Sequence, residues 1–332
     1  MFSVQIDNEQ ALTSFLNSGD LEYVDVYLHE DSATFIMDTS DVFLLVKYPC
    51  SHTPNEISRA FRVSRNLLRQ QKRANVFTFN VTESDGVIAS FMISNELVCT
   101  AKFTYQRAYS SAYESKLQLL RVGKKPVGIR LGDLHALTKL SKALGGVVNI
   151  ESGAAAALFS NGIRMYKSVK YSESLSILPK YIQILERCDS QIFAIEDFVG
   201  AQKDNFAVLI SKLRVSSNSE YFMMEQMRSQ YKADINLSNL VQFVSVHQMK
   251  VPNLILNLDS RSCSVVDSGI EYIIPVSITN EVRAKSDKVH EVTIPMSILK
   301  NIVPDVGAMT VTLEKKQFFM KMSVDNYVIL FN

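Results

Sequence analysis

The most constraining feature of this sequence is that one pattern of helix- and strand-forming segments occurs three times along its 332 residues. In each round, apolar residues at helical spacing precede several segments in which apolar and polar residues alternate, and then both kinds of segment follow again. The rounds begin near residues 8, 134 and 236. A period of about 110 residues indicates one structural unit used three times.

The first round gives the order of elements within the unit. Leu12, Phe15 and Leu16 mark a first helix, and a second helix is expected over about 55–73. Turn residues separate the alternating segments, which are expected to form strands. These segments are 21–29, 33–37, 42–48, 76–82, 87–94 and 97–105.

The second and third rounds repeat this order. Helices are expected over 134–144 and 177–187 in the second round, and over 237–244 and 295–302 in the third. Pro179 stands in a first helical turn, where its missing N–H costs nothing. The expected strands are 147–150, 155–159, 164–171, 191–195, 207–213, 221–224, 254–258, 262–266, 272–278, 309–313, 318–322 and 327–331.

The links between successive strands are too short for the crossovers that parallel strands need. The sequence therefore predicts an α+β fold of three repeated domains, each with two helices packed on antiparallel sheets. Candidate linkers lie at Lys124-Lys125-Pro126 and around Arg228–Ala233. They place the domains at 1–123, 124–230 and 231–332.

Charge is distributed unevenly although it nearly cancels overall. The 35 basic and 34 acidic residues leave a formal charge of +1, which excludes a uniformly basic surface. The helix expected at 55–73 places its cations in one arc, and no acidic residue occurs between Ile57 and Thr82 to pair with them along the helix. The arc consists of Arg59, Arg62, Arg65, Arg69, Lys72 and Arg73.

Such an arc is typical of a surface that binds a polyanion. Its cations would neutralise backbone phosphates, and nothing in the sequence resembles a module that reads bases. Weaker candidates for the same role are Lys139, Lys142, Lys180 and Lys300, on the other expected helices. The alternative is that these side chains only solubilise the exposed faces of amphipathic helices.

Residues that carry catalysis or bind metals are scattered. The five histidines lie singly, and the four cysteines form no pair at metal-ligand spacing. Ser297 and Lys300 match a Ser-x-x-Lys motif without its companion motifs, and neither a P-loop nor a dinucleotide fingerprint occurs. No apolar run is long enough to cross a bilayer. We therefore expect a noncatalytic cytoplasmic protein with reduced thiols and without a membrane partner, metal or cofactor.

Three short motifs within the repeat resemble those of one family. Residues 158–165, Leu-Phe-Ser-Asn-Gly-Ile-Arg-Met, are similar to the Ala-Thr-Asp-Gly-x-Arg-Leu turn in the second domain of the bacterial DNA sliding clamp, the polymerase processivity ring. Residues 177–180, Ile-Leu-Pro-Lys, resemble the opening of that domain's second helix. Residues 327–330, Tyr-Val-Ile-Leu, resemble the family's last strand.

The resemblance covers essentially the whole chain through the order of the repeats. The chain departs from the family by its shorter length, by Ile163 in place of a histidine in the turn, and by the ending Phe331-Asn332. These departures fit a divergent and phage-encoded member.

The resemblance implies a ring. In the family, two three-domain chains join head to tail as a homodimer, with sheets outside and helices around a hole for double-stranded DNA. A ring holds DNA by topology, so its lining needs only nonspecific cationic contacts. The DNA polymerase and the clamp loader bind such rings through short apolar peptide motifs, and ATP chemistry belongs to the loader.

The resemblance also implies a groove for partner peptides between the second and third domains. Carried over residue by residue, it consists of Leu144, Ser160, Gly162, Arg164, Met165, Val328, Ile329 and Leu330. For Met165 and Val328 the alternative is ordinary core packing. Ring closure would pair an edge strand of the first domain, 97–105, with one of the third, 254–258.

Two other functions stay open. A structural or interaction protein, such as a virion component, could use the same repeat as a scaffold without encircling DNA. An enzyme of unrecognised type is the third candidate. Retention on closed circular DNA that is lost on linearisation separates a clamp from a scaffold, because a ring slides off free ends.

Overall fold

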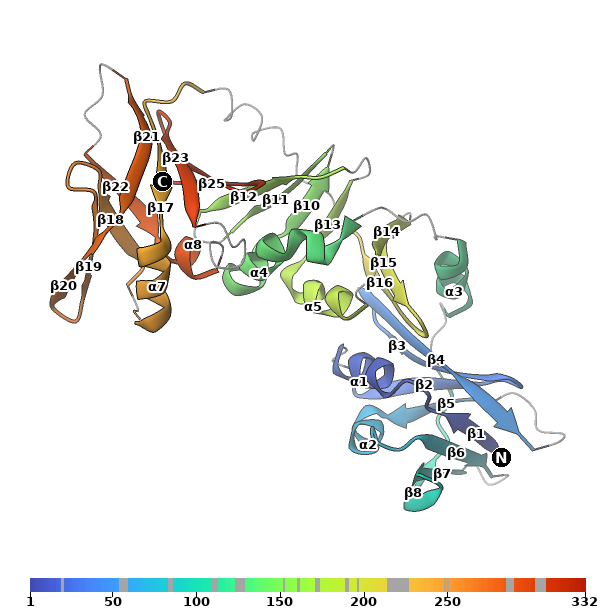
Figure 1. The fold of residues 1–332 in the computed structure, drawn as a ribbon. Coiled ribbons are helices and arrows are strands. Elements are labelled where there is room, and N and C mark those ends of the chain that lie inside the picture. The colour runs from blue at the N-terminus through green and yellow to red at the C-terminus, as the bar shows by residue number, and fades with distance from the viewer. Residues whose placement is uncertain are drawn as a thin grey trace. The chain divides into compact units, whose positions relative to one another are not determined.

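The structure of the chain is a computed structural model (Figure 1). It describes residues 1–18, 21–53, 59–82, 86–108, 113–122, 129–151, 153–159, 162–170, 174–188, 191–195, 197–213, 227–247, 249, 251–284, 290–301 and 309–332. The chain forms two compact units. The first contains Met1–Leu131 and Gln183–Lys212, and the second contains Gly132–Ile182 and Leu213–Asn332.

The first repeat consists of one strand, a helix, four strands, a second helix and three strands. These elements are β1 (Phe2–Gln5), α1 (Glu9–Ser18), β2 (Tyr23–Leu28), β3 (Ser32–Asp38), β4 (Val42–His52), β5 (Arg59–Ser64), α2 (Arg65–Gln70), β6 (Val76–Val81), β7 (Gly86–Ile93) and β8 (Glu96–Thr104). A further helix, α3 (Tyr113–Val122), follows this repeat. No helix was predicted over these residues.

The second repeat has the same order. It consists of β9 (Ile129–Arg130), a 3₁₀ turn (Leu131–Leu134), α4 (His135–Leu144), β10 (Val148–Glu151), β11 (Ala154–Leu158), β12 (Arg164–Ser168), β13 (Leu175–Ile177), α5 (Pro179–Cys188), β14 (Gln191–Ile195), β15 (Phe198–Lys203) and β16 (Phe206–Ser211).

The third repeat differs only in that its fourth strand is divided in two around Val276. It consists of β17 (Tyr231–Asn236), α7 (Ser238–Val246), β18 (Asn253–Asn257), β19 (Ser262–Asp267), β20 (Ile270–Pro275), β21 (Ser277–Arg283), β22 (Glu291–Pro295), α8 (Met296–Asn301), β23 (Thr310–Lys315), β24 (Met320–Val324) and β25 (Tyr327–Phe331).

The same antiparallel pairings recur in all three repeats. The opening strand pairs with the strand after the second helix, as β1–β6, β9–β14 and β17–β23. The strands that flank the middle of the repeat also pair, as β2–β5, β10–β13 and β18–β22. The predicted α+β fold with repeated antiparallel units is confirmed.

Successive repeats are joined by strand pairing. The last strand of the second repeat, β16, pairs with β4 of the first, and the last strand of the third, β25, pairs with β12 of the second. We call these pairings the first and second junctions. The first junction explains why residues 183–212 belong to the first compact unit. The division into three sequential domains stays a prediction.

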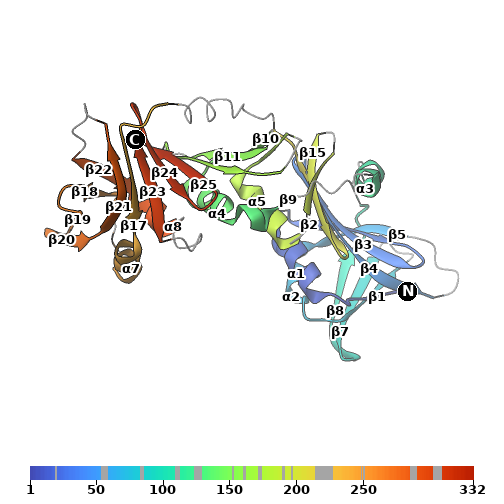
Figure 2. The same ribbon diagram turned by 45° about the horizontal axis from the view of Figure 1, so that its top comes forward.

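Each junction has a helix-covered face. At the first, α1 packs on β4 and β16, and the buried Tyr48 hydroxyl donates a 2.7 Å hydrogen bond to the Asn8 carbonyl before α1. The Asn8 side chain in turn accepts the Ala11 N–H at 3.0 Å, as expected of an N-cap. At the second, α4 contacts β10, β11 and α8. Figure 2 shows α1 and α2 together on one side of the first unit's sheets.

The helix predicted over about 55–73 is confirmed only at residues 65–70, and residues 55–58 lie outside the described part of the chain. Residues 59–64 form β5, which pairs with β2, and α2 begins only at Arg65, after Ser64 in an extended conformation. The two-residue period of a strand explains the difference, because Phe61 and Val63 are buried and alternate with more exposed residues. The apolar residues of this segment fit both a period of two and a helical period.

Truncation of Phe61 tests this assignment. Phe61 is fully buried in β5 and its ring lies 5.3 Å from that of Phe79, whereas Leu67 is only half-buried in α2. We expect Phe61→Ala to lower the free energy of unfolding by about 3 to 5 kcal/mol, and Leu67→Ala by less than about 2 kcal/mol. Urea denaturation measures both, and equal losses would contradict the strand assignment.

Candidate nucleic-acid and partner-binding surfaces

Arg62 is a structural residue of the first unit. It lies opposite Asp25 in the β2–β5 pair, and its Nε and Nη2 donate to the two Asp25 carboxylate oxygens at 2.8 and 3.0 Å. The Asp25 side chain is 6% exposed. The hydrogen bond to Asp25 raises the pKa of the Arg62 guanidinium above its ordinary value. Arg62 therefore neutralises a buried carboxylate on the neighbouring strand. It lies on strand β5 and is not part of a cationic helix face.

Arg65 also makes contacts within the protein. It begins α2, and its Nε donates to the Leu16 carbonyl at 2.7 Å near the end of α1. Its Nη1 lies 3.4 Å from the Leu21 carbonyl. The Leu16 carbonyl lies in the last turn of α1, where a cation satisfies carbonyls that the end of a helix leaves unpaired.

The other cations of the expected arc are exposed. Arg59 lies on β5, Arg69 on α2, and Lys72 and Arg73 in the turn that follows α2. The single cationic helix face is therefore wrong. A smaller cationic surface remains around the end of α2, formed by Arg69, Lys72 and Arg73.

The weaker candidates lie on helices as expected. Lys139 is half-buried and Lys142 exposed on α4, Lys180 is exposed at the start of α5, and Lys300 is exposed on α8. The Lys300 Nζ donates to the Met249 carbonyl at 2.5 Å, and the Lys180 Nζ lies 4.6 Å from the centre of the Tyr181 ring.

The helices that pair across the repeats carry few acids. In the helices α1, α2, α4, α5, α7 and α8, as far as they are described, the only acidic residues are Glu9 and Glu186. Arg187 of α5 donates to the Ser14 carbonyl at 3.1 Å and to the Ser18 hydroxyl at 2.6 Å, both in α1. A cationic side chain thus connects the second helix of one repeat to the first helix of the preceding one.

The predicted peptide-groove residues divide between the two faces of the second junction. Arg164 pairs with Leu330, Met165 with Ile329 and Tyr166 with Val328. Met165 and Ile329 are fully buried, and neighbouring side chains of a strand point to opposite faces. Arg164, Val328 and Leu330 therefore share the face away from α4, whereas Met165 and Ile329 face α4. For Met165, the structure agrees with the core-packing alternative.

The remaining groove candidates lie at the ends of these elements. Gly162 is exposed in the turn before β12 with a φ of +82°, a value that favours glycine. Its N–H donates to the Phe159 carbonyl at 2.9 Å. Leu144 is half-buried at the end of α4. Ser160 lies outside the described residues.

The apolar cluster on this face contains the predicted Val328 and Leu330 and three residues that were not predicted, Ala156, Tyr166 and Phe319. Ala156, Tyr166 and Leu330 are buried together, and Phe319 and Val328 pack against them. Leu158, at the end of β11, and Phe318, between β23 and β24, are 54% and 68% exposed. Tyr166 follows Met165 in a strand, so the two side chains point to opposite faces of the sheet. This places Tyr166 beside Val328 only once the register of β12 with β25 is known.

No group of metal-ligating side chains occurs in the described part of the chain. Burial raises the pKa of the Cys188 and Cys263 thiols to about 12, so both are unreactive at neutral pH. None of the helices as described is long and apolar enough to span a membrane.

Substitution of Arg62 and Arg69 by glutamine separates their roles. Arg62→Gln leaves the buried Asp25 carboxylate without its cation, so we expect a loss of about 1 to 3 kcal/mol in the free energy of unfolding. Arg69→Gln changes an exposed side chain, and we expect a change within about 0.5 kcal/mol. Thermal denaturation of both variants makes the comparison. A stable Arg62→Gln protein would return Arg62 to the candidates for DNA contact.

The fold was compared with known proteins. No family model and no curated protein match the chain. Among solved structures, it is similar to the DNA polymerase III subunit beta of Pseudomonas aeruginosa, with a TM-score of 0.72 and 11% identity over 100% of this chain and 99% of that one. A putative beta subunit from Eubacterium rectale gives 0.70 and 10% over 100% and 99%, and the beta subunit of Streptococcus pyogenes 0.69 and 8% over 100% and 98%. Over its whole length, the chain therefore has the fold of the DNA polymerase III beta subunit, the sliding clamp.

Proposed function

We propose that this protein is a DNA sliding clamp, a noncatalytic ring that encircles double-stranded DNA and tethers a DNA polymerase. The observation that carries the proposal is the way in which one repeat completes the next. At both junctions, the last strand of a repeat pairs with the fourth strand of the preceding repeat. A chain built by this rule has one last strand and one fourth strand left over, and a second copy of the chain supplies the missing partners.

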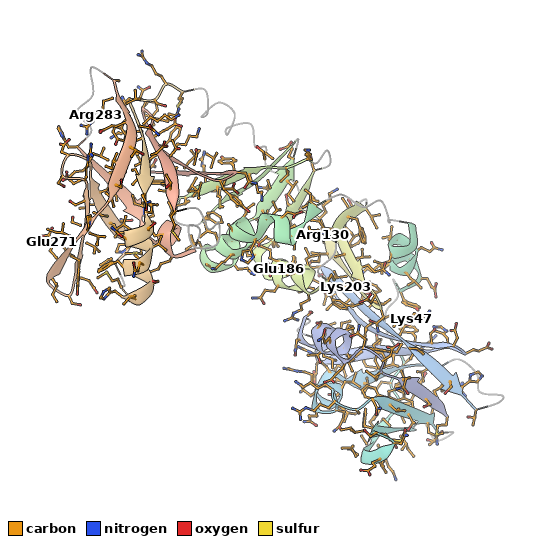
Figure 3. All side chains as sticks on the ribbon, viewed as in Figure 1. Lys47, Arg130, Glu186, Lys203, Glu271 and Arg283 are labelled. Atoms are coloured by element: carbon orange, nitrogen blue, oxygen red, sulfur yellow. The ribbon has the colours of Figure 1, made fainter. Side chains whose placement is uncertain are left out.

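The two unused strands are β8 and β20. Each is the outermost strand of its sheet in the described residues. Apolar side chains are exposed along both, with Leu97 and Val98 at 63% and 53% on β8, and Ile270 and Ile273 at 54% and 68% on β20. Exposed apolar edge strands favour pairing with another chain. Glu271 marks this outer strand of the third repeat (Figure 3).

Strand β18 is excluded as the joining edge. Residues 254–258 were expected to join residues 97–105, but β18 already pairs with β19 on one side and β22 on the other. A strand with two neighbours has no free backbone N–H and C=O groups to offer a further strand. We infer head-to-tail closure through β8 of one subunit and β20 of the other, which gives a homodimeric ring of six repeats.

The helices support a DNA-facing interior. They supply Lys139, Lys142, Lys180 and Lys300, together with Arg69, and contain few acids. Nonspecific phosphate contacts of this kind allow a ring to slide. The apolar face at the second junction is suited to a short partner peptide from the polymerase or the clamp loader, which would supply the ATP chemistry. We place this activity in the cytoplasm of a bacterium or of a phage-infected cell.

Loading experiments test the encircling function. We expect the protein, once loaded on nicked circular DNA, to be retained during gel filtration, and to be released when a restriction enzyme linearises the circle. Equal retention on circles and linear DNA would favour the scaffold alternative.

A pair of matched variants tests whether β20 joins two subunits into a ring. Ile273→Lys places a charge on the free edge of β20, so we expect the dimer to dissociate to the 37.4 kDa monomer. Ile255→Lys is the control, because Ile255 is 43% exposed on the central strand β18 of the same sheet. Sedimentation analysis reads the mass. Dissociation by Ile255→Lys alone would place the interface elsewhere.

Substitution of two helix-borne cations tests whether the helices contact DNA. We expect Arg69→Gln with Lys142→Gln to weaken binding to a short DNA duplex and to lower the slope of log affinity against log salt by about one unit for each phosphate that is no longer neutralised. Lys203→Gln with Lys232→Gln, at exposed lysines on strands, is the matched control. Fluorescence anisotropy at several salt concentrations measures both. An equal change in both slopes would argue against helix-borne DNA contacts.

A further inference from the structure

The two junctions are equivalent residue by residue on the face away from the first helix. Strand register gives two rows at each junction, and each row runs across three strands. At the first junction the rows are Ile36–Leu45–Ala207 and Asp38–Phe43–Leu209. At the second they are Ala156–Tyr166–Val328 and Leu158–Arg164–Leu330.

Helix α3 covers these rows at the first junction. Tyr113 and Leu120 are buried in a cluster with Ile36, Phe43 and Leu45, and Leu117 packs against it. The Tyr113 ring also stacks on Tyr27 with centroids 4.4 Å apart and an interplanar angle of 18°. Figures 1 and 2 show α3 and α1 on opposite sides of the sheet.

A cation of α3 contacts the first junction. The Lys116 ammonium forms an ion pair with Asp38, and the two side chains are only 13% and 15% exposed. The same ammonium lies 5.4 Å from the centre of the Phe43 ring. Tyr113, Lys116, Leu117 and Leu120 of α3 therefore contact the sheet at the spacing i, i+3, i+4 and i+7, and Leu119 also packs against the cluster.

In the described residues of the second unit, no helix residue belongs to the corresponding cluster at the second junction. Ala156, Tyr166 and Leu330 form it with Phe319 and Val328, all from strands or turns. Two substitutions distinguish this face. Leu158 and Arg164 stand where the first junction has Asp38 and Phe43.

Helix α3 does not fill its own groove. Two adjoining hollows of about 510 and 600 Å³ lie beside it and share Leu45, Lys47 and Leu117. Lys47 extends from β4 on the side of α3 (Figure 3). Three carboxylates, Glu30, Asp31 and Glu114, line the larger hollow together with Lys47 and His29. The hydrogen bond from Ser32 and the charge of Lys47 lower the pKa of Asp31. The space beside α3 is therefore lined by Leu45 and Leu117 and by more carboxylates than lysines.

We propose that the face under α3 is a second peptide-docking groove, that α3 occupies it as a ligand within the chain, and that it takes an amphipathic partner peptide carrying a cation. The inference rests on the proposed function, because it treats the second junction as a peptide groove. The partner's cation takes the place of Lys116 beside Asp38, and its apolar side chains take those of Tyr113, Leu117 and Leu120. Leu158 and Arg164 make the second groove unsuited to the same cation.

Displacement of α3 tests the proposal. Lys116→Glu sets two carboxylates side by side and leaves the sheet beneath unchanged. The double variant Asp38→Lys with Lys116→Glu restores an ion pair with reversed signs. The probe is a fluorescein-labelled peptide with the sequence of residues 113–122, added to the full chain. The control peptide carries glutamate at the position of Lys116.

We expect the probe to bind Lys116→Glu at least about tenfold more tightly than the unaltered protein, because the vacated groove retains Asp38. The reversed pair should return binding to the level of the unaltered protein, and the glutamate peptide should not bind Lys116→Glu. Hydrogen exchange should show faster exchange of the α3 amides in Lys116→Glu and normal exchange in the reversed pair. Circular dichroism checks that the sheets are intact.

Two results would overturn the proposal. One is fast exchange of α3 without binding of the probe. The other is unchanged exchange in both Lys116→Glu and a second variant, Leu117→Asp with Leu120→Asp, because α3 would then not be displaceable. Retention on circular DNA is measured separately. Probe binding without retention would overturn the clamp function alone, and retention without probe binding would overturn the second groove alone.

Discussion

The structure depends on one interaction, the pairing of the last strand of each repeat with the fourth strand of the repeat before it. This pairing joins β16 to β4 and β25 to β12, and it continues each sheet from one repeat into the next. Backbone hydrogen bonds along these strands commit the repeats to a fixed order and direction. They also leave the last strand of the first repeat, β8, and the fourth strand of the third, β20, without such a partner, each at the edge of its sheet in the described residues.

Much of this fold could be predicted from hydrophobic periodicity, because most of its elements show only one period. The helix with Leu12, Phe15 and Leu16, and the strand from Tyr327, are examples. The junction pairings could not be predicted in this way. Val42 of β4 and Ile210 of β16 are partners although they lie far apart in the sequence. The residue pattern of either strand alone does not indicate which strand it pairs with. The free edge was misassigned to 254–258 for the same reason, since β18 and β20 are both apolar and differ only in their neighbours.

The cationic surface was predicted in part. Arg69, Lys72 and Arg73 are exposed as expected, but Arg62 lies on strand β5 and Arg65 donates to carbonyls within the protein. The acid that holds Arg62 lies on another strand, at Asp25, so the absence of acids nearby in sequence was misleading. The apolar face of the second junction was located by resemblance to a known family. Which face of the sheet each residue lies on could be assigned only from the strand register. Arg164 and Met165 are neighbours in the sequence and lie on opposite faces of the sheet.

Helix α3 was missed although its apolar residues have helical spacing, because the repeat pattern leaves no place for it. The apolar cluster under α3 includes the ring of Phe193. A side-chain carbon at position 200 would lie 2.2 Å from that ring, so the packing of the cluster requires Gly200. An element outside the repeat thus makes equivalent faces differ. The first junction is covered within the chain, the second is open in the described residues, and a third would arise only where β20 meets β8 of another subunit. On the proposed function, small differences at equivalent positions, as between Asp38 and Leu158, and the element that covers each face would determine which partner peptide binds there.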